Sequence, residues 1–261
     1  MDMPVTITTV LATSDAPLAD AQVDAVSAWI CVTADKPRWR GMPHGRTLGL
    51  RHARQAAAAL HEAWATDLPN RRSTRAVHLP LGEHPSSFEL LTAARRAVEL
   101  ALEHNPAELL VSLHGVTPTL AAACAEALAS AALARGVPLP SAKRIPSPPA
   151  KLARLRVHGK GVALDAARIR AEAAGNGLVR QLAALPPNEL TPGRYRERVA
   201  HLAGDRGLRY DFHDVAALKR RGAGAFLAVV QGSAVADAGI VHLAYRPPRA
   251  RRETPRVALV G

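Results

Sequence analysis

The sequence predicts an α/β protein with a mostly parallel β-sheet in its first part. Short apolar runs, dense enough for burial on both faces, alternate with helical segments that carry capping residues. Strand, helix, strand and helix at this spacing imply parallel pairing through right-handed crossovers. Hydrophobic residues make up 48% of the 261 positions and charged residues 21%, a composition that excludes an intrinsically disordered chain.

The amino-terminal part is expected to begin with two strands followed by a helix. Val5 to Leu11 is the first apolar run, and Ala25 to Val32 ("AVSAWICV") is the second. Proline and glycine in "KPRWRGMPHGRT" then interrupt regular structure. Leu48 to Trp64 is rich in alanine and has a helical period, so it is predicted to be a helix.

A further strand and the clearest helix of the chain follow. Arg75 to Gly82 ("RAVHLPLG") is predicted to be a strand. Ser86 is followed three residues later by Glu89, which is the capping-box pattern. The amphipathic sequence after Ser86 is therefore predicted to be a helix that begins at this box.

One more strand and helix complete the first domain. Ala107 to Gly115 ("AELLVSLHG") is predicted to be a strand. Thr117 and Pro118 suit the N-cap and first position of a helix, and Gly136 suits its end. Residues 1–150 are therefore assigned to an amino-terminal α/β domain.

Residues 151–186 are predicted to form a linker strand and a linker helix. Within "HGKGVALD", Lys160 and Asp165 have a spacing that two metal ligands could use, because a neutral lysine offers a nitrogen and an aspartate an oxygen. The alternative is a strand, a tight glycine turn and Asp165 as the N-cap of the next helix. We favour the N-cap, because the alanines after Asp165 supply no further ligand. The helix is expected to run to Leu185.

Residues 187–261 are predicted to begin a second α/β domain. Thr191 and Pro192 again suit the start of a helix, and the preceding "PPNEL" has no periodic pattern, which indicates a shaped loop. The segments that follow are a strand ("LRYDF"), a short helix ("DVAALKRRG"), a glycine-rich stretch ("GAGAFLAVVQGS"), a strand ("GIVHLAYR"), a basic loop and a final strand ("PRVALVG"). The final strand is apolar on both faces, so it is predicted to belong to a central sheet.

Composition and motifs limit the functional classes. The sequence has no H-E-x-x-H, C-x-x-C, Walker or G-x-S-x-G motif. Cys31 and Cys124 lie in apolar surroundings without metal-type spacing, which favours buried thiols in a reducing cytoplasm. His114 lies at a strand end, where some catalytic residues are found, but a structural role is the simpler interpretation. The sequence has no apolar run of membrane-spanning length and no secretory signal pattern at its start.

The order of segments in the last part resembles the leucyl (cytosol) aminopeptidase family of two-metal peptidases. An N-x-L-T-P loop, a G-x-G-A-F-L-x-V-x-x-G-S stretch, a strand ending in tyrosine and the final strand carry the resemblance. The matching residues are Asn188, Leu190, Thr191 and Pro192; Gly222, Gly224, Ala225, Phe226, Leu227, Val229, Gly232 and Ser233; and Tyr245. The family usually has methionine at the position of Ala223 and a proline pair after the G-S, where this chain has "AVADAG". The amino-terminal α/β (macro-like) domain is compatible in size and type but carries no matched motif.

The resemblance implies a metal-dependent aminopeptidase that releases N-terminal amino acids from peptides. For the full-length family protein it implies two divalent metal ions (manganese or zinc), a homohexamer and a cytoplasmic location. In the family, the first metal-binding lysine and aspartate directly follow the strand that matches the segment ending at Gly261. We therefore expect a truncated chain with no catalytic and no metal-binding residue, inactive alone. Lys160 precedes the Asn188 loop, which is the wrong order for a family ligand.

A second hypothesis is a non-catalytic, basic α/β binding module. The formal net charge of +12 and the run from Arg246 to Arg256 ("RPPRARRETPR") suit weak phosphate contacts with a nucleic acid. The arginines are spread along the chain, however, and aromatic residues make up 3%, so stacking platforms for bases are scarce. The same features equally suit a solvated surface and a loop between strands. We expect no membrane partner under either hypothesis.

Overall fold

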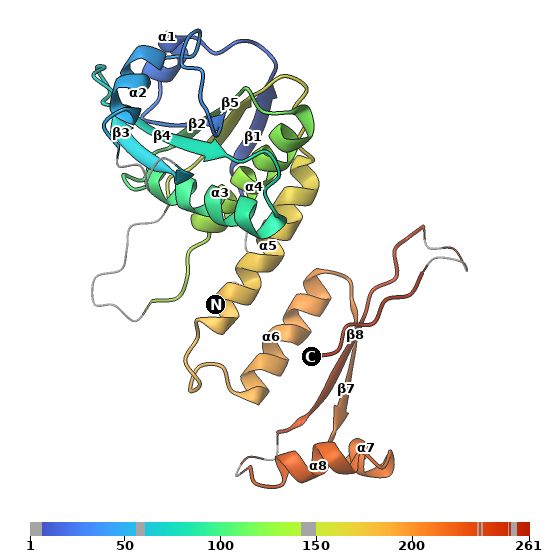
Figure 1. Ribbon diagram of the computed structural model, residues 1–261. Helices are drawn as coiled ribbons and strands as arrows, with labels where there is room; N and C mark the ends of the chain where they lie inside the picture. Colours follow the sequence, from blue (N-terminus) through green and yellow to red (C-terminus); the bar gives the residue numbers. More distant parts are fainter. Residues whose placement is uncertain are drawn as a thin grey trace. The chain divides into compact units, whose positions relative to one another are not determined.

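The computed structural model describes residues 7–55, 61–141, 150–233, 235, 237–249, 251 and 255–261. The chain divides into two compact units, Val5–Ala184 and Leu185–Gly261. Figure 1 shows both units, coloured along the sequence. In the described part of the chain, no helix is both long enough and apolar enough to span a bilayer.

The first unit is built around a six-stranded sheet with the strand order β1-β6-β5-β2-β4-β3. Its strands are β1 (Val10–Ser14), β2 (Ala28–Ala34), β3 (Trp64–Asp67), β4 (Arg75–Leu81), β5 (Glu108–His114) and β6 (Arg154–His158). Neighbouring strands pair in parallel except at one edge, where β3 pairs antiparallel with β4. The predicted α/β class with a mostly parallel sheet is confirmed.

Two hydrophobic clusters bury the two faces of this sheet. In β2, Ile30 and Val32 belong to the larger cluster, while Trp29 and Cys31 belong to the smaller one, as the two-residue period of a strand requires. The helices α3 (Ser87–Ala101), α4 (Pro118–Gly136) and α5 (Ala166–Ala183) contribute to the larger cluster. The shorter helices α1 (Asp20–Asp24) and α2 (Gly45–His52) contribute to the smaller one.

Capping residues fix two helix starts where the sequence predicts them. The Ser86 hydroxyl accepts a hydrogen bond from the Glu89 backbone N–H at 3.3 Å, and the Ser86 backbone N–H donates to the Glu89 carboxylate at 2.8 Å. The Thr117 hydroxyl accepts from the Leu120 backbone N–H at 3.4 Å, with Pro118 at the first helical position. The predictions for α3 and α4 are confirmed, including the end of α4 at Gly136.

The prediction of a single helix from Leu48 to Trp64 is wrong. The helix ends at His52, positions 56–60 lie outside the described residues, and Trp64 begins β3. Trp64 pairs with His78 of β4, so antiparallel pairing overrides the weak helical preference of the alanine-rich sequence. The first strand is also displaced, because among the described residues its pairing with β6 begins at Val10; positions 5 and 6 of the predicted strand lie outside the described residues.

The sequence suggests residues 151–186 as a linker, but residues 151–184 contribute an inner strand and a helix to the first unit. The strand β6 lies between β1 and β5. The Asp165 carboxylate accepts a hydrogen bond from the Arg168 backbone N–H at 3.0 Å, so its N-cap role at α5 is confirmed. The Arg168 side chain in turn makes an ion pair with Glu126 of α4 at 2.6 Å, which ties α5 to α4.

The second unit is a helix followed by a two-stranded hairpin with two short helices in its connection. Its elements are α6 (Pro192–Asp205), β7 (Arg209–Asp214), α7 (Val215–Arg220), α8 (Gly224–Val230) and β8 (Gly239–Ala244). The strands β7 and β8 pair antiparallel. The two strands and the short helix predicted over 208–244 are confirmed. A Cβ at Gly239 would overlap the Phe212 ring and lie 2.6 Å from the His213 backbone carbonyl oxygen, so this end of β8 requires glycine.

The final apolar segment is not a strand, contrary to prediction. Residues 255–261 have no regular structure, and Val257, Leu259 and Val260 are 83%, 94% and 98% exposed. A strand takes its hydrogen bonds from a neighbouring strand, and the described part of this unit pairs β7 with β8 alone. Bare apolar surface in this segment agrees with the sequence-based expectation.

Candidate functional site

The asparagine loop forms the entry to helix α6. The Glu189 and Leu190 backbone N–H groups donate to the Pro186 carbonyl at 2.9 and 3.0 Å, which closes a turn around the exposed Asn188. The Thr191 hydroxyl accepts from the Arg194 backbone N–H at 3.4 Å. Thr191 is therefore the N-cap, with Pro192 at the first helical position, as predicted.

A residue of the segment before β8, Asp237, also binds the N-terminus of α6. The Gly193 backbone N–H donates to the Asp237 carboxylate at 2.9 Å. A carboxylate at this position is favourable, because free N–H groups give a helix N-terminus a partial positive charge. Within the second unit, this hydrogen bond links the helix start that follows the N-x-L-T-P loop to the residue two positions before β8.

The glycine-rich stretch makes the turn between α7 and α8. Gly222 has a φ of 70°, a left-handed conformation that favours glycine. Gly224 begins α8, which also contains the half-buried Phe226. Gly232 and Ser233 follow the helix, and the Ser233 hydroxyl donates to the Val235 carbonyl at 3.0 Å. These motif residues thus shape the backbone at both ends of α8.

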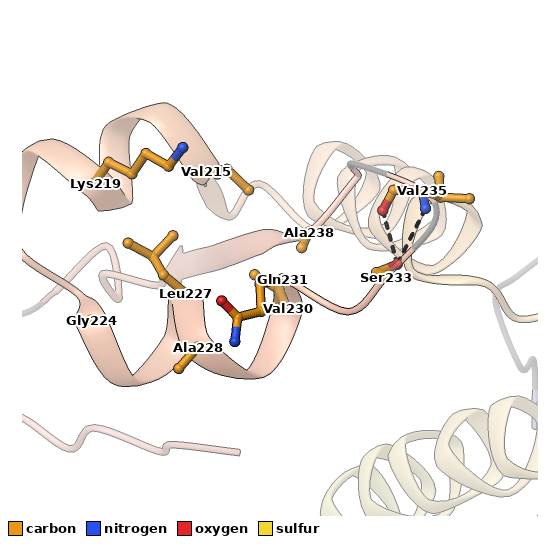
Figure 2. A pocket seen from close by; sticks show the side chains of 10 residues that line it. All are labelled: Val215, Lys219, Gly224, Leu227, Ala228, Val230, Gln231, Ser233, Val235 and Ala238. Atoms are coloured by element: carbon orange, nitrogen blue, oxygen red, sulfur yellow. Dashed lines mark hydrogen bonds between the residues drawn. The ribbon is translucent and has the colours of Figure 1, made fainter.

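A pocket of about 530 Å³ lies along α7, α8 and the turn after α8. Figure 2 shows the lining side chains, with Lys219 on α7 and the Ser233 hydroxyl turned toward Val235. Its lining residues are Val215, Lys219, Gly224, Leu227, Ala228, Val230, Gln231, Ser233, Val235 and Ala238. The structure therefore brings two of the matched glycine and serine positions, Gly224 and Ser233, to one pocket.

The residues that line this pocket include no nucleophile with an adjacent base. Lys219 is its one charged residue, and Gln231 and Ser233 are its neutral polar side chains. A nucleophilic serine needs an adjacent base, and the ten lining residues include no histidine, aspartate or glutamate. The pocket can offer hydrogen bonds and one positive charge to a ligand.

The candidates in the first unit belong to its internal structure. The His114 ring nitrogen Nε2 lies 2.9 Å from the Ser112 hydroxyl, which also accepts from the Trp29 indole N–H at 2.9 Å. Burial lowers the pKa of His114, so its ring is neutral at neutral pH. Cys31 and Cys124 are buried free thiols, as predicted, and burial raises the pKa of Cys124 to about 12.

The residues that the structure describes do not form a site for the two divalent metal ions that the family resemblance implies. Within them, no group of three or more histidine, cysteine, aspartate or glutamate side chains is arranged to hold a metal ion. Lys160 is exposed in the turn after β6, and Asp165 is engaged as a helix cap. No catalytic step is therefore assigned to side chains of this chain.

One cluster of histidine and tryptophan rings in the first unit was not predicted from the sequence. Trp39, His52, Trp64 and His78 form a cluster of rings on the face of the sheet that α1 and α2 cover. A histidine in the middle of the apolar run "RAVHLPLG" was the available signal. Its partners come from separate segments, so their proximity had no local pattern.

Comparison with known proteins gives the family. A sequence model of the cytosol aminopeptidase family, catalytic domain, matches residues 177–261. The probable cytosol aminopeptidase of Parasynechococcus marenigrum is 36% identical over 200 residues, which cover 74% of this chain and 40% of the relative. The chain belongs to the cytosol aminopeptidase family. The relative from Synechococcus elongatus is 30% identical over 185 residues, covering 69% of this chain and 36% of its own length.

Solved structures of cytosol aminopeptidase relatives share the fold. A tomato leucine aminopeptidase mutant superposes with a TM-score of 0.72 at 18% identity and covers 94% of this chain and 52% of its own. The bottromycin maturation enzyme BotP in complex with Mn gives a TM-score of 0.59 at 22% identity, covering 85% and 46%. The chain thus spans about 40% of the P. marenigrum relative and about half of these structures. The family resemblance and the fold class are confirmed, and the alternative of a basic binding module is not favoured.

Proposed function

We propose that this chain is the amino-terminal portion of a leucyl aminopeptidase-like metallopeptidase that releases N-terminal amino acids from peptides. The observation that carries the proposal is the match of residues 177–261 to the catalytic-domain family. The order of the asparagine loop, the glycine-rich stretch and the strand ending before Tyr245 supports it. In this proposal residues 1–150 are the amino-terminal domain, 151–186 the connection and 187–261 the start of the catalytic domain.

The matched motif residues have a structural role in this proposal. Thr191 caps α6, Gly222 provides a left-handed turn, and Ser233 holds the backbone after α8. Each interaction orders the backbone and leaves no activated nucleophile or base. The proposed contribution of 187–261 to catalysis is a folded scaffold beneath a metal centre formed by other residues.

The full-length protein is proposed to use two divalent metal ions, manganese or zinc. Such ions lower the pKa of a bound water and polarise a peptide carbonyl. A manganese complex among the related structures supports a metal of this class for the family. The protein is further proposed to act on peptides in the cytoplasm as a homohexamer, and residues 1–261 alone are proposed to be inactive.

The coding sequence that follows Gly261 tests this proposal. We expect an in-frame lysine and glycine directly after "VALVG", then three intervening residues and an aspartate (K-G-x-x-x-D). The product extended through this frame should hydrolyse leucine p-nitroanilide when manganese or zinc is added. A frame without this pattern, or an extended product that is folded and fully metal-loaded but inactive, would count against the proposal.

A further inference from the structure

The helix α2 and the loop before it form a basic surface around one exposed leucine. Leu50 lies on α2 and is 58% exposed. Arg46 lies one turn before Leu50 on the same face of the helix, and Arg51 follows Leu50 directly. No acidic residue occurs between Lys36 and His61. The exposed cationic side chains that define this basic surface are Arg38, Arg40, Arg46, Arg51 and Arg54.

The packing of Trp39 on α2 holds the loop part of the basic surface in place. A Cβ atom at Gly45 would overlap the Trp39 carbonyl oxygen, and a Cβ atom at Gly49 would lie 3.1 Å from the Trp39 indole ring. The two glycines therefore allow the loop to lie directly on the helix. Because Arg38 and Arg40 flank Trp39 in the sequence, their backbone is held beside the start of α2.

The positive charges of the basic surface are not neutralised within the described part of the chain. None of its five arginines makes an ion pair with a described residue. Asp35, the acidic residue just before this region, pairs with His61 at 2.8 Å instead. The basic surface therefore offers an apolar side chain and several uncompensated cations to a partner.

The start of α3 carries an exposed apolar pair beside two glutamates. Phe88 and Leu91 are 79% and 53% exposed, and their spacing of three positions places them on one face of the helix. Glu83 and Glu89 are exposed. The side-chain and backbone hydrogen bonds of the capping box lower the pKa of Glu89, so it is ionised at neutral pH. Glu83, Phe88, Glu89 and Leu91 define the acidic surface.

The arginines further along α3 have a carboxylate of their own. Arg95 makes an ion pair with Glu99 at 2.8 Å, and Arg96 approaches the same carboxylate at 3.9 Å. Glu83 and Glu89 lie before these pairs, at the start of the helix. The acidic surface therefore has the charge opposite to that of the basic surface.

The basic and acidic surfaces lie on opposite sides of the first unit. Leu48 of α2 packs in the smaller hydrophobic cluster and Leu90 of α3 packs in the larger one, and these clusters cover the two faces of the sheet. The two surfaces thus cannot contact each other within one molecule. A contact between them requires a second copy of the chain.

The chemistry of the two surfaces favours a protein partner. Protein interfaces combine an apolar centre with a polar rim, and arginine and aromatic side chains are enriched among the residues that carry binding energy. A nucleic-acid backbone would pair with the arginines but would offer phosphates rather than an apolar group to cover Leu50. The acidic surface supplies both requirements, because it has carboxylates beside Phe88 and Leu91.

We propose that the basic surface of one copy binds the acidic surface of a second copy, with Leu50 of the first against Phe88 and Leu91 of the second. Because the two surfaces differ, each copy in such a pair keeps one unoccupied surface. Association therefore continues head to tail and ends in a ring or a filament. The contact lies in the first unit and uses none of the aminopeptidase motif residues, so it stands or fails independently of the proposed peptidase function.

Sedimentation velocity of the 261-residue chain over a range of micromolar concentrations tests the proposal. We expect wild type to form species larger than a dimer as its concentration rises, and added salt should weaken the association. Leu50→Glu places a carboxylate opposite the glutamates of the second copy, and Phe88→Ser removes the aromatic anchor. Each change should raise the dissociation constant at least about tenfold.

Mixing the two variants distinguishes a head-to-tail contact from a symmetric one. Leu50→Glu keeps its acidic surface and Phe88→Ser keeps its basic surface, so an equimolar mixture retains one intact contact. We expect this mixture to form dimers that neither variant forms alone, and no larger species. Val179→Ser is the matched control, because Val179 is 64% exposed on α5, outside both surfaces. It should associate as wild type does, and circular dichroism checks the fold of every variant.

Three results would overturn the proposal. The first is a wild-type chain that stays monomeric at all concentrations, whether or not it binds an added acidic peptide or nucleic acid. The second is association that is unchanged in folded Leu50→Glu or folded Phe88→Ser, as expected if the exposed apolar residues at 257–260 make the contact. The third is an equimolar mixture of the two variants that forms no dimer.

Discussion

The backbone N–H of Gly193 lies 2.9 Å from Oδ2 of Asp237 and donates a hydrogen bond to it. A Cβ atom at position 193 would lie 2.9 Å from the same oxygen, closer than ordinary contact. The absence of a side chain at Gly193 therefore allows the carboxylate to reach the start of α6. This contact links residues 44 positions apart and orders the loop that contains the matched motif.

Gly193→Ala is expected to lower the free energy of unfolding of the second unit by about 0.5 to 3 kcal/mol, because a lost hydrogen bond to a charged group costs about 1.5 to 3 kcal/mol and alanine in a helix returns up to about 1 kcal/mol. Gly204→Ala is the matched control, because a Cβ there meets nothing within 4 Å and α6 has alanine-compatible geometry. It should be neutral or stabilising by up to about 1 kcal/mol. Tyr195, Tyr210 and Tyr245 are the three tyrosines of the chain, so tyrosine near-ultraviolet signals during urea unfolding report this unit. Equal stability of the two variants would contradict the account.

Asp165→Ala is expected to lower the stability of the first unit by about 1 kcal/mol, because α5 loses its N-cap. Lys160→Ala, five residues earlier on an exposed turn, should change stability by less than about 0.5 kcal/mol. All three tryptophans lie in the first unit, so tryptophan fluorescence during urea unfolding measures both variants. A larger loss in Lys160→Ala than in Asp165→Ala would reverse the assigned roles.

The Ser86–Glu89 capping box should make α3 sensitive to acid. Hydrogen bonds from the Ser86 side chain and then from its backbone lower the pKa of Glu89. A lowered carboxyl pKa adds stability above the pKa of the unfolded chain, and this stability is lost as the pH falls through the folded value. Glu89→Gln keeps a capping partner but cannot ionise.

Urea unfolding of wild type and Glu89→Gln, compared between pH 7 and pH 3, tests whether the ionised carboxylate of Glu89 stabilises the protein. The advantage of wild type at pH 7 should shrink as the pH falls below the ordinary range of glutamate. Glu83→Gln, just before the box, is the control and should not reproduce the effect. A wild-type advantage that grows in acid would show that the carboxylate does not stabilise the helix start.

Helix starts could be predicted because their interactions are local. Ser86, Thr117, Asp165 and Thr191 each accept a hydrogen bond from the backbone three residues ahead, so the pattern is complete within four positions. The same locality explains the correct order of segments in the second unit. The family resemblance depended on this order rather than on any single motif.

Non-local pairing explains what sequence reasoning missed. Trp64 is in a strand because His78, 14 residues later, is its partner in an antiparallel pair. The rings of Trp39, His52, Trp64 and His78 come from the segment after β2 and from α2, β3 and β4, and no local pattern connects them. The final segment has strand-forming residues but no partner strand among the described residues, so propensity alone did not determine its structure.

The two units should differ in resistance to proteolysis. Among the described residues, Val199, Ala203 and Leu218 are the buried hydrophobic residues of the second unit, whereas the first unit has two extensive clusters. Burial of apolar surface is the main stabilising contribution to folding. Limited trypsin digestion should therefore leave a fragment close to Val5–Ala184 and remove the second unit rapidly. A resistant carboxyl-terminal third in a monomeric chain would contradict this reading.

Hydrolysis of leucine p-nitroanilide by the purified 261-residue chain tests the central claim most directly. Residues 187–261 are proposed to form the scaffold of a cytosol aminopeptidase catalytic domain, and no metal ligand of that domain is assigned to this chain. The expected turnover with added manganese or zinc is therefore at the level of the blank. Turnover well above the blank that a chelator abolishes would contradict the account, because the active site would then lie within these residues.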